Sequence, residues 1–218
     1  MTHLQPSGGT RGGKLLLKEL RTGCEFPEDY CTVGKDHCPV LTGVGVRRKK
    51  VIGVKNIDVY AVGLYVDPVA AKKVLGSKCR GASPDDLAAQ QKLFDEVKKN
   101  DSIEKTMRLV ISFKSLTHSR FWKALEERLA PELSKKGDSE VLAAFGSQFN
   151  DLKFYKGMSM SFTGKDGQLS TRIDDKQIGT IKSKALCDAI FEIYLGADPV
   201  SKDAKESIGI GLARLATQ

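Results

Sequence analysis

The chain has 218 residues, of which 40% are hydrophobic and 28% charged, a composition typical of one globular domain rather than of a disordered segment. Its formal net charge is +8, but the basic residues are spread along the chain apart from one run at 47–50. Neither zinc-finger spacing nor an aromatic-glycine RNA motif occurs, so we expect no binding to nucleic acid. No apolar run reaches about 18 residues, so we also expect no integral membrane association.

The cysteines and histidines give no sign of a metal centre. Five cysteines occur, an odd number, and none forms a CxxC pair. Cys24, Cys31 and Cys38 stand seven apart near His37, which is a weak metal pattern, and the three histidines are scattered. The sequence therefore predicts reduced thiols in an intracellular compartment, with no disulfide framework, no metal and no cofactor.

The first 13 residues differ in composition from the rest. They are rich in Gly, Ser and Thr and contain no acidic residue. We expect residues 1–13 to form a flexible N-terminal tail, or the remnant of a trimmed targeting segment, and residues 14–218 to form a single domain.

Residues 41–66 contain the strongest strand signal. The stretch 56–66 is dense in Val, Ile and Tyr, and both of its alternating faces are apolar. Tyr60, Val62 and Leu64 share one face, and Val59, Ala61 and Tyr65 share the other. A strand that is apolar on both sides is covered on both sides.

The remaining elements follow from caps, periodicity and glycines. Helices are expected after Asp67-Pro68 and Ser83-Pro84, from Thr117, from Asp138-Ser139, before Gly196 and from Ser201. Residues 105–113 alternate as a half-buried strand, and residues 152–163 and 168–174 flank a hairpin turn. Paired helices and neighbouring hairpin strands predict an α+β fold with an antiparallel sheet.

Enzyme signatures are mostly missing from the sequence. There is no GxSxG, P-loop or HExxH motif, and Gly43 and Gly45 are better explained by close backbone packing than by nucleotide binding. If the chain turns near Gly53, Arg47 and Tyr60 can face a common space on neighbouring strands. A guanidinium and a phenol together form a good carboxylate clamp. From spacing alone, a surface arginine and a packed tyrosine remain the favoured interpretation.

Several ordered segments nevertheless resemble one known family. Residues 43–47 (GVGVR) and 60–66 (YAVGLYV) resemble the GxGxR and AxGxY segments of the chalcone-isomerase-like family. The resemblance continues through Glu104-Lys105, Leu116-Thr117, residues 154–157 and 184–190, and covers about residues 41–216. It implies the chalcone isomerase fold, in which a layer of helices packs on a large antiparallel sheet with a ligand cleft between them.

The resemblance also implies a function, which differs among members of the family. Active isomerases carry threonine where Tyr60 stands, whereas the plastid fatty-acid-binding members carry tyrosine and hold the lipid carboxylate with their arginine–tyrosine pair. Other isomerase positions fall on Phe121, near Arg128, and on Ser112 or Lys114. The resemblance therefore implies no catalysis.

We accordingly expect a carrier of long-chain fatty acids in the plastid stroma. Arg47 and Tyr60 would bind the carboxylate, and Phe113, Phe121 and Tyr194 would form the pocket wall, with plain core packing as the alternative for these aromatic residues. Two rival functions stay open, which are chalcone isomerisation to flavanones and a non-catalytic partner role beside flavonoid enzymes.

Overall fold

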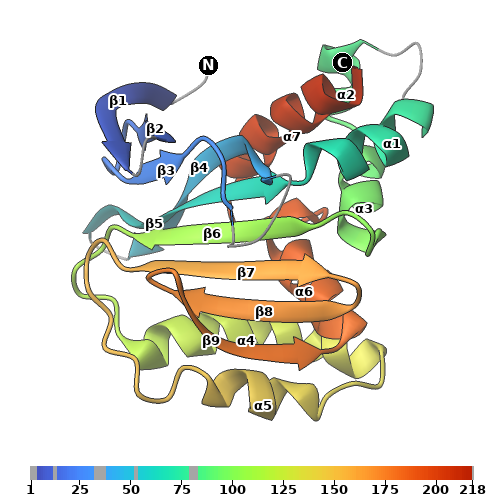
Figure 1. Ribbon diagram of the computed structural model, residues 1–218. Coiled ribbons are helices and arrows are strands. Elements are labelled where there is room, and N and C mark those ends of the chain that lie inside the picture. Colours follow the sequence, from blue (N-terminus) through green and yellow to red (C-terminus); the bar gives the residue numbers. More distant parts are fainter. Residues whose placement is uncertain (1–3, 12–13, 32–37, 52–53, 79–82, 218) are drawn as a thin grey trace.

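The computed structural model describes residues 4–11, 14–31, 38–51, 54–78 and 83–217. A six-stranded antiparallel sheet, in the order β4-β5-β6-β7-β8-β9, forms the centre of the molecule (Figure 1). Helices cover one face of this sheet, and a three-stranded sheet, β1-β2-β3, packs on part of the other face. This architecture confirms the predicted α+β class.

The elements have the following bounds. The strands are β1 (Leu4–Arg11), β2 (Lys14–Glu19), β3 (Glu25–Pro27), β4 (Val40–Val51), β5 (Val54–Val66), β6 (Lys105–Ile111), β7 (Ser159–Lys165), β8 (Gln168–Ile173) and β9 (Lys176–Lys182). The helices are α1 (Pro68–Lys78), α2 (Pro84–Ala88), α3 (Gln91–Lys99), α4 (His118–Lys135), α5 (Val141–Ser147), α6 (Lys184–Leu195) and α7 (Lys202–Thr217). Among the helices described, none is both long enough and apolar enough to cross a bilayer.

Strand β5 is covered on both sides, as its pattern predicts. Val62 and Leu64 are fully buried in the main core beneath the helices. Ala61 and Tyr65, on the other face, are fully buried in a second core together with Phe26 of β3. The two apolar faces of β5 thus join the helix layer and the small sheet into one domain.

Strand β6 corrects the prediction of a half-buried strand over 105–113. The strand ends at Ile111, and all seven of its residues are buried. Its polar face is covered because the small sheet lies over it: Arg108 donates to the Glu25 carbonyl and its guanidinium lies 5.6 Å from the centroid of the Phe26 ring. The alternation of polar and apolar residues in β6 gave no sign of this second layer, because the small sheet comes from a distant part of the chain.

The expected N-terminal tail contains a strand. Residues 4–11 form β1, which pairs antiparallel with β2, so that Leu4 lies opposite Glu19 and packs against the second core. Main-chain pairing requires no apolar pattern, which explains why composition alone indicated a tail. Residues 1–3 and 12–13 lie outside the described part of the chain.

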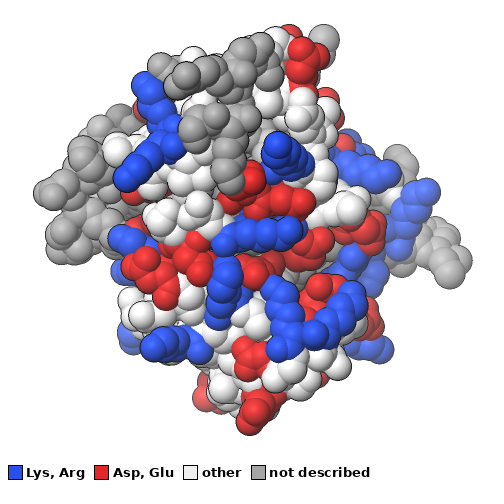
Figure 2. Space-filling model, turned by 90° about the vertical axis from the view of Figure 1, so that its right-hand side faces the viewer, with Lys and Arg blue, Asp and Glu red and all other residues white. Residues whose placement is uncertain are grey.

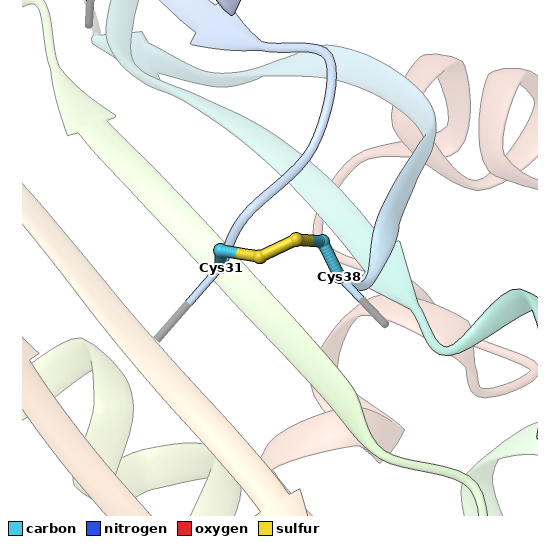
Figure 3. Close-up of a disulfide and its surroundings, with 2 residues drawn as sticks. All are labelled: Cys31 and Cys38. Carbon is cyan, nitrogen blue, oxygen red and sulfur yellow. A yellow bond between two sulfur atoms is a disulfide. The ribbon is translucent and has the colours of Figure 1, made fainter. Parts of the chain in front are cut away.

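The prediction of reduced thiols is wrong for one pair of cysteines. Cys31 and Cys38 form a disulfide, with their Cα atoms 4.7 Å apart (Figure 3). The chain segments after β3 and before β4 run side by side, because the Tyr30 amide donates to the Pro39 carbonyl at 2.9 Å. This pairing brings the two cysteines within disulfide range despite their unremarkable spacing. Cys24 and Cys187 are free and buried.

The structure confirms most of the predicted helix caps and the hairpin turn, with local exceptions. The Ser83 and Thr117 hydroxyls cap α2 and α4 as predicted, and the turn between β7 and β8 lies at Asp166-Gly167. The single helix expected after Ser83 is divided into α2 and α3, and β9 was not predicted. Asp138 does not cap α5; its carboxylate instead accepts from the Ser183 hydroxyl at the start of α6.

Charged side chains of both signs are interleaved on the face shown in Figure 2. Ion pairs link neighbouring helices: Lys98 on α3 pairs with Glu192 on α6, and Lys136 after α4 pairs with Asp188 on α6. On this face the basic side chains therefore alternate with acidic ones and do not form one basic surface.

Candidate functional site

The position of Arg47 is set by two glycines that precede it on β4. A Cβ atom on Gly43 would lie 2.4 Å from the backbone of Ser207, and one on Gly45 would lie 2.4 Å from the Cα of Ala204. Helix α7 therefore lies directly on β4, with backbone against backbone. This confirms close packing as the reason for the two glycines. Arg47 follows on the same face, just beyond the N-terminus of α7.

Arg47 lies directly opposite Tyr60 in the antiparallel ladder between β4 and β5. Both side chains extend to the helix-covered face of the sheet: Tyr60 packs against the main core, and Arg47 reaches the connection between α6 and α7. The hairpin thus brings together the two residues that the sequence singled out. Their role in ligand binding stays a prediction.

Each member of the pair has one further polar contact. The Arg47 guanidinium donates to the Val200 carbonyl at 2.6 Å, and the Tyr60 hydroxyl lies 3.1 Å from the Tyr194 hydroxyl. Val200 belongs to the α6–α7 connection, residues 196–201, and Tyr194 is on α6. We define the head-group cluster as Arg47, Tyr60 and Tyr194. The sequence did not indicate the Val200 carbonyl, because any residue supplies one.

Both phenols of the head-group cluster are protonated at neutral pH, and burial strengthens this preference. Desolvation raises the pKa of Tyr60 above its ordinary value, although the hydrogen bond with Tyr194 and the positive charge of Arg47 act in the opposite direction. Desolvation also raises the pKa of Tyr194 well above its ordinary value, and the Arg47 charge again opposes the rise. At neutral pH the head-group cluster therefore combines one positive charge with two neutral hydroxyls.

The residues predicted as pocket walls lie in different surroundings. Phe121 on α4 is 6% exposed and belongs to an aromatic cluster, with ring centroids 5.1 Å from Phe154 and 6.0 Å from Phe149. Phe113 is partly exposed just after β6, where its amide donates to the Val59 carbonyl. Tyr194 is 3% exposed and faces Tyr60. In this conformation Phe121 is a core residue, and Tyr194 contacts the predicted clamp through the Tyr60 hydroxyl.

A surface pocket of about 500 Å³ lies beside the head-group cluster rather than over it. It opens between α2, α3 and α7, and its lining includes Phe94, Lys205 and Ile210. Ala197 and Pro199 of the α6–α7 connection also line it, so this connection separates the pocket from Arg47. The pocket includes neither Arg47 nor Tyr60.

A second arginine with tyrosine neighbours lies on the opposite face of the sheet. Arg108 is 6% exposed near Tyr30 and Tyr65, but protein groups already take up the hydroxyls there. Tyr65 donates to the Pro27 carbonyl at 2.9 Å, and Tyr30 donates to the Asp175 carboxylate at 3.1 Å. This cluster is explained by packing of the small sheet, whereas the two phenols of the head-group cluster contact each other.

The residues that the resemblance assigned to isomerase positions have the following surroundings in the structure. Phe121 has no hydroxyl and is enclosed by aromatic rings. Arg128 pairs with Asp198 at 2.8 Å on the surface, and the Ser112 hydroxyl donates to the Asp58 carbonyl at 2.7 Å. Lys114 is exposed.

Comparison with known proteins identifies the family. The family model described as chalcone-flavanone isomerase matches residues 23–215. The chain belongs to this family. A crystal structure of an Arabidopsis thaliana fatty-acid-binding protein superposes with a TM-score of 0.81 at 33% identity, covering 93% of this chain and 100% of that one. This likeness confirms the chalcone isomerase fold.

Relatives in the family differ in name. Fatty-acid-binding proteins 1 and 2 of Arabidopsis thaliana are 33% and 35% identical over 98% and 88% of this chain. The chain spans 76% of the first and about half, 49%, of the second. A chalcone–flavanone isomerase of Oryza sativa subsp. japonica is 30% identical over 88% of this chain and 88% of its own length.

Proposed function

We propose that this chain binds long-chain fatty acids reversibly and without chemical conversion, with Arg47 and Tyr60 holding the carboxylate. The observation that carries the proposal is the cross-strand pairing of these two residues on the helix-covered face of the sheet. The similarity to proteins named for fatty-acid binding supports the same ligand class.

The head group would be held mainly by charge-assisted hydrogen bonds. A guanidinium offers two parallel N–H donors to a carboxylate, and the Tyr60 hydroxyl offers a third donor. Hydrogen bonds to a charged group contribute about 1.5–3 kcal/mol. Because Tyr60 stays protonated, it donates to the ligand without adding a competing negative charge. The Val200 carbonyl now occupies one donor of Arg47, and the remaining guanidinium donors suffice for a ligand.

The acyl chain would supply most of the affinity. Each methylene removed from water contributes about 0.8 kcal/mol before ordering costs. In this proposal the acyl chain lies within the main core between the sheet and helices α4 and α6, where Phe121 and Phe154 pack together. Entry of a chain there would displace side chains that are now packed. The proposed ligand site is therefore one that opens with its ligand.

Absence of catalysis is part of the proposal. An isomerase needs polar groups that orient water and stabilise an oxyanion, and loss of one such donor costs about 10²–10³ in rate. Phe121 supplies no such group, and Arg128 is held by Asp198 at the surface. We therefore expect binding without turnover.

Two measurements test the proposal directly. Protein purified from bacteria should release fatty acid when it is extracted with organic solvent and analysed by mass spectrometry. After delipidation, Arg47→Ala and Tyr60→Phe should each bind dodecanoate at least about tenfold more weakly in titration calorimetry. The matched control is Arg48→Ala, because Arg48 is the next residue on β4 but pairs with Asp203 instead. Equal affinity in wild type, Arg47→Ala and Tyr60→Phe would rule out the assigned roles.

Chalcone isomerisation is the second candidate, because isomerases are among the relatives. Incubation of the protein with a chalcone, followed by its visible absorbance, separates the two functions. The proposal predicts no loss of absorbance beyond the spontaneous rate. Rapid conversion to flavanone would make the chain an enzyme.

A partner role without a ligand is the third candidate, since chalcone isomerase-like protein 1 of Humulus lupulus is 29% identical over 90% of this chain. Protein that carries no fatty acid after purification and binds none in titration would favour that role. The proposal also includes the plastid stroma as the compartment, on family resemblance. Imaging of the full-length gene product fused to a fluorescent protein tests that part by itself.

A further inference from the structure

The phenols of Tyr60, which is partly buried, and Tyr194, which is buried, meet beside the Arg47 side chain. The hydroxyls of Tyr60 on β5 and Tyr194 on α6 are 3.1 Å apart. One of them donates this hydrogen bond and the other accepts it. Because a phenol has one O–H donor in addition to its acceptor capacity, the accepting phenol keeps its own hydrogen for a further acceptor. The pair therefore uses only one of its two donors internally.

The charge of Arg47 acts on both phenols, since it opposes the burial-driven rise in the pKa of each. Tyr194 therefore lies within electrostatic range of the guanidinium, as Tyr60 does. A phenol is protonated at neutral pH, and desolvation raises the pKa of both phenols further, so neither serves as the counter-ion of Arg47. An anion that enters here meets one cation and two neutral donors, which come from two strands and a helix.

We propose that Tyr194 is a third head-group residue, and that its hydroxyl determines selectivity for a carboxylate over a neutral head group. When a carboxylate enters, the Tyr60–Tyr194 hydrogen bond opens and each hydroxyl donates to a carboxylate oxygen, while Arg47 pairs with the charge. The two oxygens of a carboxylate accept about four hydrogen bonds, so they can take all of these donors. This inference rests on the proposed function and adds the group that sets ligand class.

A neutral head group cannot use the same set of donors. The single oxygen of an alcohol accepts fewer bonds and brings no charge to Arg47. Binding of an alcohol would gain little from opening the phenol pair. The hydrogen bond between the two hydroxyls would be lost, and only one weaker hydrogen bond to the alcohol oxygen would replace it. Tyr194→Phe should therefore lower the affinity for the fatty acid and leave the affinity for the alcohol unchanged.

The chain offers a matched control for loss of a buried phenol. Tyr65 is fully buried on the opposite face of β5, and its hydroxyl donates to the Pro27 carbonyl at 2.9 Å. Tyr65→Phe also removes the hydroxyl of a buried tyrosine, but from the second core on the face of the sheet opposite Arg47. If loss of a buried hydroxyl lowers stability in general, both variants should show it. A change in the preference for a carboxylate head group should appear in Tyr194→Phe alone.

The experiment compares dodecanoate with dodecanol, which share a chain and differ in head group. Affinities are measured by displacement of a fluorescent fatty-acid probe, for wild type, Tyr194→Phe and Tyr65→Phe. We expect Tyr194→Phe to weaken dodecanoate binding about tenfold, as loss of a hydrogen bond to a charged group does, and to leave dodecanol binding unchanged. Tyr65→Phe should leave both affinities unchanged. Circular dichroism checks that each variant is folded.

Two outcomes overturn the inference in different ways. In the first, Tyr194→Phe binds dodecanoate with wild-type affinity, or its affinities for dodecanoate and dodecanol fall equally. Tyr194 is then a packing residue and does not determine head-group selectivity. In that case the Arg47→Ala and Tyr60→Phe variants still test the proposed function, which stands if their affinity for dodecanoate falls. If wild type binds no dodecanoate at all, the proposed function and the inference fail together.

Discussion

Arg47 and Tyr60 face each other across the β4–β5 ladder, yet each is tied to a different part of the helix layer. Arg47 donates to the Val200 carbonyl before α7, and Tyr60 contacts the Tyr194 hydroxyl on α6. One hairpin thus supplies both groups, and the two closing helices fix their directions. A substitution that shifts α6 or α7 should therefore change the geometry of the head-group cluster.

The shape of the cation at position 47 should matter as well as its charge. Arg47→Lys keeps the positive charge but replaces a planar fork by a compact ammonium. We expect its dodecanoate affinity to fall between those of wild type and Arg47→Ala in titration calorimetry. An Arg47→Lys affinity equal to that of wild type would show that charge alone suffices.

Close contact between β4 and α7 should make Gly45 sensitive to the smallest side chain. A Cβ atom there would lie 2.4 Å from Ala204, so Gly45→Ala forces the helix away from the strand. We expect the free energy of unfolding in urea to fall by about 1–3 kcal/mol, as for other overpacked sites.

Gly76→Ala provides the control for this glycine. Its Cβ would meet the Ala216 carbonyl at 3.6 Å, an ordinary contact, inside α1. Alanine favours a helix over glycine by about 0.5–1 kcal/mol, so this variant should be slightly more stable. Equal losses at both positions would contradict the packing explanation.

The disulfide should contribute to stability but not to binding. Cys31–Cys38 lies next to Tyr30, which belongs to the second core on the face opposite the head-group cluster. Replacing both cysteines by serine should lower the free energy of unfolding by about 2 kcal/mol. Dodecanoate affinity should stay at the wild-type value in titration calorimetry, and a loss of affinity would show that the two faces of the sheet are coupled.

Buried Lys105 should make the protein more stable at mildly alkaline pH. Burial lowers its pKa from 10.5 to about 8 in the folded state. Between these two values the unfolded chain binds more protons, so the contribution of this group to stability rises with pH. The gain is on the order of 2 kcal/mol.

Lys105→Met isolates this contribution. Its free energy of unfolding, measured by urea denaturation at pH 7 and pH 9.5, should rise less than that of wild type. Identical changes in the two proteins would show that Lys105 is not desolvated. Titrating groups on which the Lys105 charge does not act cancel in the comparison. The Cys187 thiol, whose pKa the Lys105 charge lowers, does not cancel.

Local signals in the sequence predicted most of the fold. The Ser83 and Thr117 caps, the Asp166-Gly167 turn and the two-sided burial of β5 depend on neighbouring residues, so the sequence shows them directly. The N-terminal sheet was missed because β1 has few apolar residues and its stability comes from pairing with β2.

The head-group cluster was predictable only in part. Arg47 and Tyr60 belong to one hairpin, so their meeting follows from strand register. The hydroxyl contact between Tyr60 and Tyr194 joins residues 134 apart and depends on how α6 packs on the sheet. The disulfide likewise depends on segments brought together by main-chain pairing beside Tyr30.

The most direct test of the account follows the carboxyl carbon of a bound fatty acid. Dodecanoate labelled with carbon-13 at the carboxyl group is bound to the protein, and its chemical shift is recorded while the pH is lowered. A guanidinium beside a carboxylate favours the ionised form, so the bound carboxyl should stay ionised well below the pH at which the free acid is protonated. In Arg47→Ala this protection should disappear. A bound carboxyl that titrates like the free acid in wild type would contradict the claim that Arg47 holds it.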